Sequence, residues 1–301
     1  MPIAKVYLEL TNSCNLNCVM CYRNAWQFET QDMSKDVLDQ CIQQISETVS
    51  IKEVVLGGIG EPTYAGDAQR VMHALEDKYL TLTTNGTIMH PSMVETIVDC
   101  VDHMVLSIDG MHDVFYSMRQ YPLARIIENM KAFNKQKAKK GSKTPALSLQ
   151  MVITTTNQDQ MMQIIDLAVS LQASQVIFSN ILPTHSDDEA LVLYKRYENS
   201  AMQKHVQRVQ NYAFCRGMEV KFPASQLKTE RRCRFIEDHT LTITATGDVT
   251  PCYRFAHDGS EVVFGRNKEV IAKSFGHIGK QTLQEIWQDP SYEAFRATVY
   301  N

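Results

Sequence analysis

The chain has 301 residues, of which 44% are hydrophobic and 21% charged, and its formal net charge is −4. This composition is typical of a globular protein with a sizeable core, and the small charge argues against nucleic acid or an anionic membrane as a partner. No apolar run is long enough to cross a bilayer, and the N-terminus lacks the features of a secretion signal. We therefore expect a soluble cytoplasmic protein, whose eight cysteines serve metal or redox chemistry rather than disulfides.

Short β-branched runs alternate with amphipathic stretches over the first two thirds of the chain. We predict strands at Lys5–Thr11, Glu53–Leu56, Leu80–Thr84, His103–Ile108, Ala146–Ile153 and Gln175–Asn180. The intervening helices are expected at Ser34–Val49, Asp67–Asp77, Pro91–Cys100, Leu123–Lys140 and Gln158–Leu171. Such alternation favours a parallel sheet with crossover helices. Six strands are too few for an eight-stranded barrel, so we predict an α/β fold, a partial (β/α)6 barrel with its chemistry at the carboxyl ends of the strands.

The pattern changes towards the C-terminus. A longer helix is predicted at Glu189–Arg216, and a hairpin follows, in which Leu241–Thr244 and Val249–Pro251 flank a turn at Gly247. A final helix is predicted at Leu283–Val299. We therefore predict two domains, residues 1–220 and a small α+β extension of residues 221–301.

Three cysteines, Cys14, Cys18 and Cys21, follow the first predicted strand directly. Close spacing lets one loop supply three thiolates to a four-iron cluster, which leaves one iron free for a further ligand. Two alternatives compete with this interpretation, namely buried thiols and three of the four ligands of a zinc site. Buried thiols do not need this spacing, and no fourth Cys or His lies nearby in the sequence to complete a zinc site.

The pattern Cys-x3-Cys-x2-Cys after the first strand resembles the signature of the radical S-adenosylmethionine (SAM) superfamily. The resemblance implies an enzyme that binds a [4Fe–4S] cluster and SAM, cleaves SAM reductively to a 5′-deoxyadenosyl radical and abstracts a substrate hydrogen. It also implies an electron donor such as ferredoxin or flavodoxin. Where the family usually has an aromatic residue before the third cysteine this chain has Met20, and Tyr22 is adjacent. Both are candidates for SAM contact.

A glycine-rich segment, Gly57–Pro62, follows the second predicted strand and resembles the superfamily's GGE-type motif. In that family the motif binds the amino group of SAM. The resemblance therefore implies a contact by the backbone of Gly58 and Gly60 and by Glu61, and backbone carbonyls and a carboxylate suit an ammonium group.

Polar residues also stand where later strands end. Asn85, Ser107 and Asp109 match positions that hold the ribose and carboxylate of SAM in the family, and Asn180 ends the sixth predicted strand. The alternative interpretation is turn chemistry, because Asn-Gly and Asp-Gly pairs commonly form turns. All four residues are candidates for the SAM pocket.

Two further cysteines, Cys233 and Cys252, bracket the predicted hairpin as Cys-x13-Gly-x4-Cys. This resembles the opening half of the SPASM and Twitch auxiliary-cluster domains, which implies a second iron–sulfur cluster. The domain's remaining cysteines are absent, so either the chain is truncated or these ligands are lost; two buried thiols are the alternative. Cys215 is a weak candidate for a catalytic hydrogen-atom donor. Cys41 and Cys100 fall on predicted apolar helix faces, as core residues do.

Longer matches extend over most of the chain, among them Tyr7–Asn12, Cys21–Trp26, Gly57–Tyr64 and Pro251–Tyr253. They resemble maturases associated with tungsten-dependent aldehyde ferredoxin oxidoreductases. The implied substrate is a tungsten or molybdenum pterin cofactor, or the partner oxidoreductase itself, with Arg23 and Trp26 on the substrate side. Two alternatives stay open: an enzyme that modifies a peptide or protein, and a non-catalytic iron–sulfur module for electron transfer or binding.

Overall fold

The computed structural model describes residues 1–26, 28–227 and 232–299. Its centre is a nine-stranded sheet in the order β7-β6-β5-β4-β3-β2-β1-β8-β9. All neighbouring strands run parallel except β9, which pairs antiparallel with β8. The strands are β1 Lys5–Leu8, β2 Glu53–Leu56, β3 Tyr79–Thr84, β4 His103–Ser107, β5 Ala146–Ile153, β6 Gln175–Asn180, β7 Glu219–Lys221, β8 Thr240–Ile243 and β9 Val249–Thr250.

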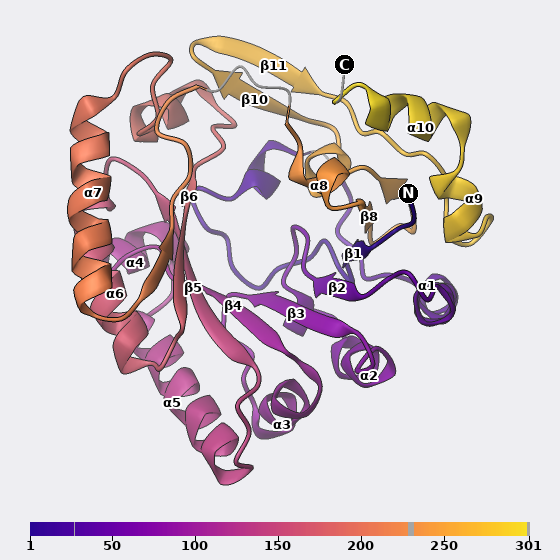
Figure 1. Cartoon of the computed structure of the whole chain (residues 1–301), viewed down its shortest axis with the longest axis horizontal. Helices are drawn as coiled ribbons and strands as arrows, with labels where there is room; N and C mark the ends of the chain where they lie inside the picture. The colour runs from indigo at the N-terminus through magenta and orange to yellow at the C-terminus, as the bar shows by residue number, and fades with distance from the viewer. Residues whose placement is uncertain (27, 228–231, 300–301) are drawn as a thin grey trace.

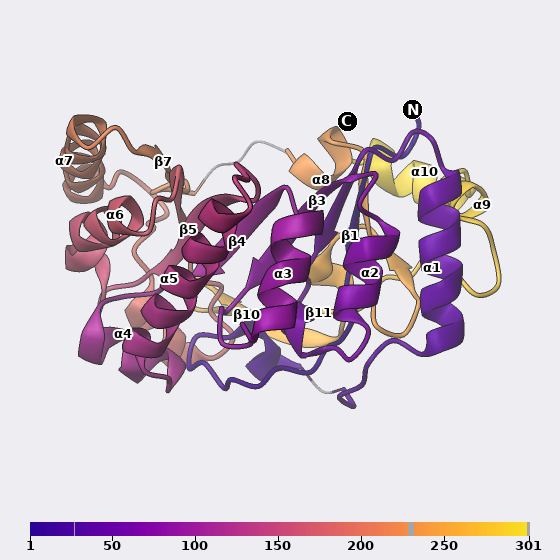
Figure 2. The same cartoon turned by 90° about the horizontal axis from the view of Figure 1, so that it is seen from below.

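Helices cover the outer side of this curved sheet, and a two-stranded hairpin lies on the other side (Figure 1). The helices are α1 Lys35–Glu47, α2 Ala68–Ala74, α3 Pro91–Cys100, α4 His112–Arg119, α5 Leu123–Lys139, α6 Met161–Ser170 and α7 Ser200–Cys215. Figure 2 shows α1, α2, α3 and α5 following one another along the sheet. The C-terminal part adds α8 Arg234–Glu237, the hairpin β10 Gly259–Val263 and β11 Arg266–Val270, and then α9 Leu283–Trp287 and α10 Pro290–Ala297.

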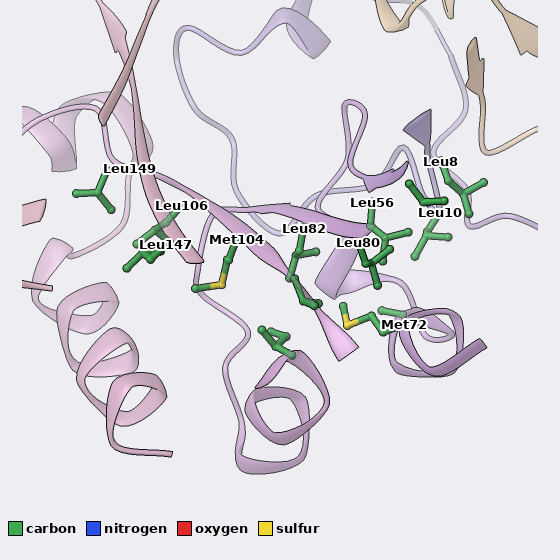
Figure 3. Packing of buried hydrophobic residues seen from close by; sticks show 14 of the residues in the cluster. Leu8, Leu10, Leu56, Met72, Leu80, Leu82, Met104, Leu106, Leu147 and Leu149 are labelled. Atoms are coloured by element: carbon green, nitrogen blue, oxygen red, sulfur yellow. The ribbon is translucent and has the colours of Figure 1, made fainter. Parts of the chain in front are cut away.

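The hydrophobic core lies between the sheet and these helices. Leu8, Leu56 and Leu82 stand in register on neighbouring strands, and all three are fully buried. Figure 3 shows them packed with Met72 of α2. Because side chains alternate along a strand, residues such as Ser107 and its register partner on β5 point to the other face of the sheet. The helices therefore leave the inner face of the sheet for polar side chains.

The fold confirms the α/β class, and strands form at all six predicted places. The predicted hairpin is also confirmed, with Gly247 at φ +91° in its turn. One predicted helix, Glu189–Arg216, is wrong. A 3-10 helix at Ser186–Leu191 is followed by extended chain, because Lys195 exchanges backbone hydrogen bonds with Ser225 and Leu227. The helix α7 begins only at Ser200.

The predicted final helix, Leu283–Val299, is also wrong as one element. It divides into α9 and α10, because Pro290 has no N–H to continue the first helix. The Asp289 carboxylate instead accepts hydrogen bonds from Ser291 N and Tyr292 N, which caps a new helix. Among the described residues, the helices α4 and α8, the strand β7 and the β10–β11 hairpin were not predicted.

The C-terminal part is joined to the barrel through β8, which pairs in parallel with β1 from Lys5↔Thr240 to Leu8↔Ile243. A strand from residues 240–243 thus lies beside the first strand of the chain. The division at residue 220 stays a prediction. Within the described part of the chain, no helix has both the length and the apolarity that a membrane crossing requires.

Candidate active site

The three clustered cysteines lie in the loop between β1 and the 3-10 helix Tyr22–Ala25, and all have free, partly exposed thiols. This loop is fixed by backbone contacts, since Val19 N donates to Met118 O at 2.9 Å. Burial raises the pKa of Cys14, and it raises the pKa of Cys18 to about 11. Thiolates are the form that binds metal, so iron binding here must displace protons.

The three thiols of this loop are not gathered around one point, as the ligands of a single zinc ion would be. Three thiolates on one tetrahedral zinc would lie about 3.8 Å apart, given Zn–S bonds of about 2.3 Å. Among the described residues, the group of metal-ligating side chains whose donor atoms all lie within 4.8 Å of one another is His73, Glu76 and Cys100, not the cysteine loop. The wider spacing of the sulfurs suits a cluster whose irons occupy different corners, so the residues present fit a [4Fe–4S] group.

The glycine-rich segment packs directly against the cysteine loop. A Cβ atom on Gly60 would lie 2.2 Å from Thr11 O and 2.5 Å from Ser13 O. One on Gly58, whose φ is +121°, would lie 2.9 Å from the Glu9 side chain. At Gly60 only glycine permits such an approach of two backbones, and at Gly58 the positive φ favours glycine. The predicted SAM-binding glycines therefore lie beside the loop that carries the cysteines.

The carboxylate of Glu61 is buried and engaged within the protein. It accepts hydrogen bonds from Thr84 Oγ1 at 2.8 Å, Asn85 N at 2.7 Å and Thr63 Oγ1 at 2.6 Å. Burial raises its pKa, although these donors act in the opposite direction. In this arrangement Glu61 holds the loop after β2 against the loop after β3.

Asn85 reaches the cysteine loop itself. Its Nδ2 lies 3.8 Å from Cys14 Sγ and donates to Asn15 Oδ1 at 3.0 Å. Ser107 ends β4 on the inner face of the sheet, where it is partly buried. Met20 is also partly buried, within the cysteine loop. The structure thus brings Asn85 and Met20 to the cysteines, and it leaves Ser107 at the carboxyl edge of the sheet.

Asp109 is fully buried and engaged by Arg119, which the sequence had not indicated. Arg119 Nε donates to Asp109 Oδ2 at 2.5 Å, and Val152 N donates to Oδ1 at 2.7 Å. Burial lowers the pKa of Arg119, but the charges of Asp109 and Cys18 outweigh it and raise the pKa overall. A buried guanidinium therefore stands between the predicted SAM-pocket aspartate and the cysteine loop.

Tyr22 connects the cysteine loop to the C-terminal hairpin. Its hydroxyl donates to Glu261 Oε1 of β10 at 2.6 Å, and Arg254 Nε donates to the same oxygen at 2.5 Å. Burial acts to raise the pKa of Glu261, but these donors hold it below its usual value. The tyrosine predicted for SAM contact thus also anchors the C-terminal part over the loop.

A second link joins Glu9, at the end of β1, to His257. The Glu9 carboxylate accepts from Ile59 N at 3.2 Å and lies 3.3 Å from His257 Nε2. The imidazole packs against both Trp26 and Phe28 in tilted contacts, with ring centroids 4.5 Å and 4.8 Å away. The sequence analysis missed Glu9 and His257, because 248 positions separate them. The sequence offered one signal for this site, which is that Glu9 is an acidic residue at the end of a buried strand.

Two buried donors just past the cysteines have no hydrogen-bond partner among the described residues, namely Arg23 Nε and Trp26 Nε1. Orphaned buried donors are rare in folded proteins and call for a ligand or water. Arg23 and Trp26 are also the two residues that the sequence analysis predicts to line the substrate side.

The C-terminal cysteines precede two short helices, Cys233 before α8 and Cys252 before the 3-10 helix Tyr253–Phe255. Burial raises the pKa of Cys252, and the nearby Cys233 adds to the effect. Cys215 ends α7 and is exposed, whereas Cys41 and Cys100 are buried as predicted. Asn180 Nδ2 donates to Ala224 O at 3.0 Å, and Asn180 lines a small cavity with Ile153 and Phe222.

Two sequence families match this chain. The radical SAM superfamily matches residues 8–168, and an iron–sulfur cluster-binding domain, SPASM, matches residues 233–301. This chain belongs to the radical SAM superfamily. Its cofactors are therefore a [4Fe–4S] cluster and SAM, and the SPASM domain implies additional iron–sulfur clusters.

Individual relatives of this radical SAM protein agree with that assignment. The "tungsten-containing aldehyde ferredoxin oxidoreductase cofactor-modifying protein" of Pyrococcus furiosus is 29% identical, over 98% of this chain and 84% of the relative. The crystal structure of Streptococcus suis SuiB bound to S-adenosylmethionine has a TM-score of 0.73 at 18% identity, covering 98% of this chain and 68% of SuiB. That of anSMEcpe with AdoMet and a peptide has a TM-score of 0.71 at 15% identity, covering 100% and 84%. These two structural similarities show the fold.

Proposed function

We propose that this chain cleaves SAM reductively at a [4Fe–4S] cluster held by Cys14, Cys18 and Cys21. We further propose that it matures a tungsten or molybdenum pterin cofactor, or the oxidoreductase that carries it. The observation that supports maturation is the similarity to the cofactor-modifying protein of Pyrococcus furiosus, which extends over 98% of this chain. Similarity confined to the barrel would support the SAM chemistry but not a substrate.

The chain's own residues have distinct parts in this proposal. When bound, the cluster and SAM together supply a 5′-deoxyadenosyl radical that abstracts hydrogen. The backbone of Gly58 and Gly60 would hold the ammonium group of SAM, because Gly60 packs against the chain that leads to the cysteines and Gly58 is exposed nearby. Glu61 keeps their loop in place through Thr84 and the backbone of Asn85. Cys233 and Cys252 would hold an auxiliary cluster.

The substrate would lie beside the 3-10 helix that follows the cysteines. The unpartnered Arg23 Nε and Trp26 Nε1 are donors suited to an oxygen-rich substrate such as a pterin cofactor. The contacts of Tyr22 with Glu261 and of Glu9 with His257 close the C-terminal part over this place. Such closure would keep water from a reactive radical.

The first experiment is anaerobic reconstitution, followed by iron counting and by an assay of SAM cleavage with dithionite, ferredoxin or flavodoxin as the electron donor. We expect about four irons per chain for one cluster and about eight for two, with 5′-deoxyadenosine as a product. The Cys252→Ala variant should lose only the auxiliary iron. Iron binding without 5′-deoxyadenosine would instead support an electron-transfer module.

The second experiment tests the substrate. Incubation with a tungsten oxidoreductase that carries immature cofactor should consume SAM and change the mass of the extracted pterin. If only peptides stimulate SAM cleavage and acquire a mass change, the maturation proposal fails and peptide modification replaces it.

A further inference from the structure

A second group of metal-ligating side chains lies far from the carboxyl edge of the sheet. His73 is in the last turn of α2, Glu76 follows that helix, and Cys100 is the last residue of α3. The chain enters β3 and β4 directly after these two helix ends. The group therefore lies at the amino ends of the strands, at the opposite end of the barrel from the cysteine loop.

The donor atoms of this group are close together. Cys100 Sγ lies 3.1 Å from His73 Nδ1 and 3.6 Å from Glu76 Oε2. His73 Nδ1 lies 3.9 Å from the same Glu76 oxygen. In a tetrahedral zinc site with Zn–S of about 2.3 Å and Zn–N or Zn–O of about 2.0–2.2 Å, donor atoms lie roughly 3.3–3.6 Å apart. Shifts of a few tenths of an ångström would bring all three onto one ion.

The electrostatic surroundings favour a cation here. Two neighbouring helices end at this group, and the C-terminus of a helix carries a partial negative charge. The Glu76 carboxylate adds a full charge. Burial raises the pKa of Cys100 to about 11, with Glu76 as the next cause, so without a cation the thiol keeps its proton. A bound metal ion reverses this preference and releases the proton to solvent.

The group combines an anchored ligand with two accessible ones. Cys100 is 5% exposed, whereas His73 and Glu76 lie on the surface. The two helices are held together next to the site, since Gln69 Nε2 of α2 donates to Thr96 Oγ1 of α3 at 3.0 Å. An ion can therefore enter from solvent without rearrangement of the core.

We propose that His73, Glu76 and Cys100 bind one divalent transition metal ion, zinc foremost, with water as the fourth ligand. The mixed sulfur, nitrogen and oxygen set suits zinc better than calcium or magnesium, which prefer oxygen alone. The bound ion would link the C-terminal end of α2 to the C-terminal end of α3. This site is independent of the proposed SAM chemistry, because none of its ligands belongs to the cysteine loop.

The test uses the full chain with its iron–sulfur clusters assembled. Zinc is added anaerobically, unbound metal is removed, and zinc and iron per chain are measured together. We expect the unaltered chain to retain about one zinc ion more than His73→Ala and Cys100→Ser, with the same iron content in all. Cobalt in place of zinc should give a sulfur-to-cobalt charge-transfer band that Cys100→Ser lacks.

A matched control is available in the same chain. His185 forms an equivalent i,i+3 pair with Asp188, at 3.8 Å from Nδ1 to Oδ2, and among the residues that the structure describes no cysteine completes a donor group with it. His185→Ala should therefore retain as much zinc as the unaltered chain. Equal zinc in the unaltered chain and in His73→Ala, or zinc uptake matched by iron loss, would overturn the proposal. His73 is exposed, so its variant keeps the fold, and SAM cleavage by that variant should be unchanged.

Discussion

The two cysteine regions of this radical SAM protein are built in different ways. Cys14, Cys18 and Cys21 lie in one loop. The glycine-rich segment packs so closely against this part of the chain that a larger residue would clash. Cys233 and Cys252 stand on separate segments on either side of the β8–β9 hairpin. The first region gathers its ligands by local sequence, whereas the second needs the hairpin to form before its sulfurs can meet. Their sensitivity to mutation should differ accordingly.

The largest effect is expected from Cys18→Ala. Loss of one of three thiolates should abolish the SAM-binding cluster and remove SAM cleavage completely. Iron per chain and 5′-deoxyadenosine are the measurements, and Cys41→Ala is the control, because Cys41 is a buried thiol in α1. Full cleavage by the Cys18 variant would contradict the assignment of the first region.

Gly60→Ala should have the next largest effect on SAM cleavage, because its new methyl group would meet the backbone carbonyls of Thr11 and Ser13. We expect SAM cleavage to fall by at least about tenfold and stability by about 1–3 kcal/mol, the usual cost of overpacking. The control is Gly66→Ala, since a Cβ atom at Gly66 meets nothing within 4 Å. Equal activity of the two variants would show that the loops can separate without loss.

Arg119→Leu tests the charge pair behind the first region. It would leave the Asp109 carboxylate buried without its cation, which should cost about 3–5 kcal/mol of unfolding free energy. Thermal melting of the reconstituted protein measures the loss. The double variant Arg119→Leu with Asp109→Leu should recover part of it, because the uncompensated charge is then removed as well. A double variant as unstable as the single one would show that packing, not charge, dominates.

The smallest effect is expected from Tyr22→Phe. This variant tests how strongly the cysteine loop is coupled to the C-terminal part of the chain. It removes the hydrogen bond to the Glu261 carboxylate, which Arg254 still engages, so the expected cost is about 0.5–1.5 kcal/mol. The cluster should still assemble, while hydrogen exchange in β10 should become faster. Tyr116→Phe is the control, because Tyr116 is exposed on α4. Unchanged exchange in β10 would indicate that other contacts hold the hairpin.

The sequence predicted those features whose residues lie close together along the chain. The three cysteines, the glycine-rich segment and the six strands depend on spacing and alternation within a few residues, and the structure has all of them. Glu9 with His257, and Tyr22 with Glu261, depend on a fold that joins residues 248 and 239 positions apart. No local pattern encodes such a pair. The engagement of Asp109 by a buried Arg119 was missed for a related reason, since arginine is usually exposed.

The position of β8 has a consequence for synthesis on the ribosome. β1 has β2 on one side, but its other neighbour is residues 240–243, which are made much later. At about 5–20 residues per second, the nascent barrel would carry an open strand edge for on the order of tens of seconds. Such edges readily pair with other chains. Chaperone occupancy during translation should therefore be highest before the last fifth of the chain emerges.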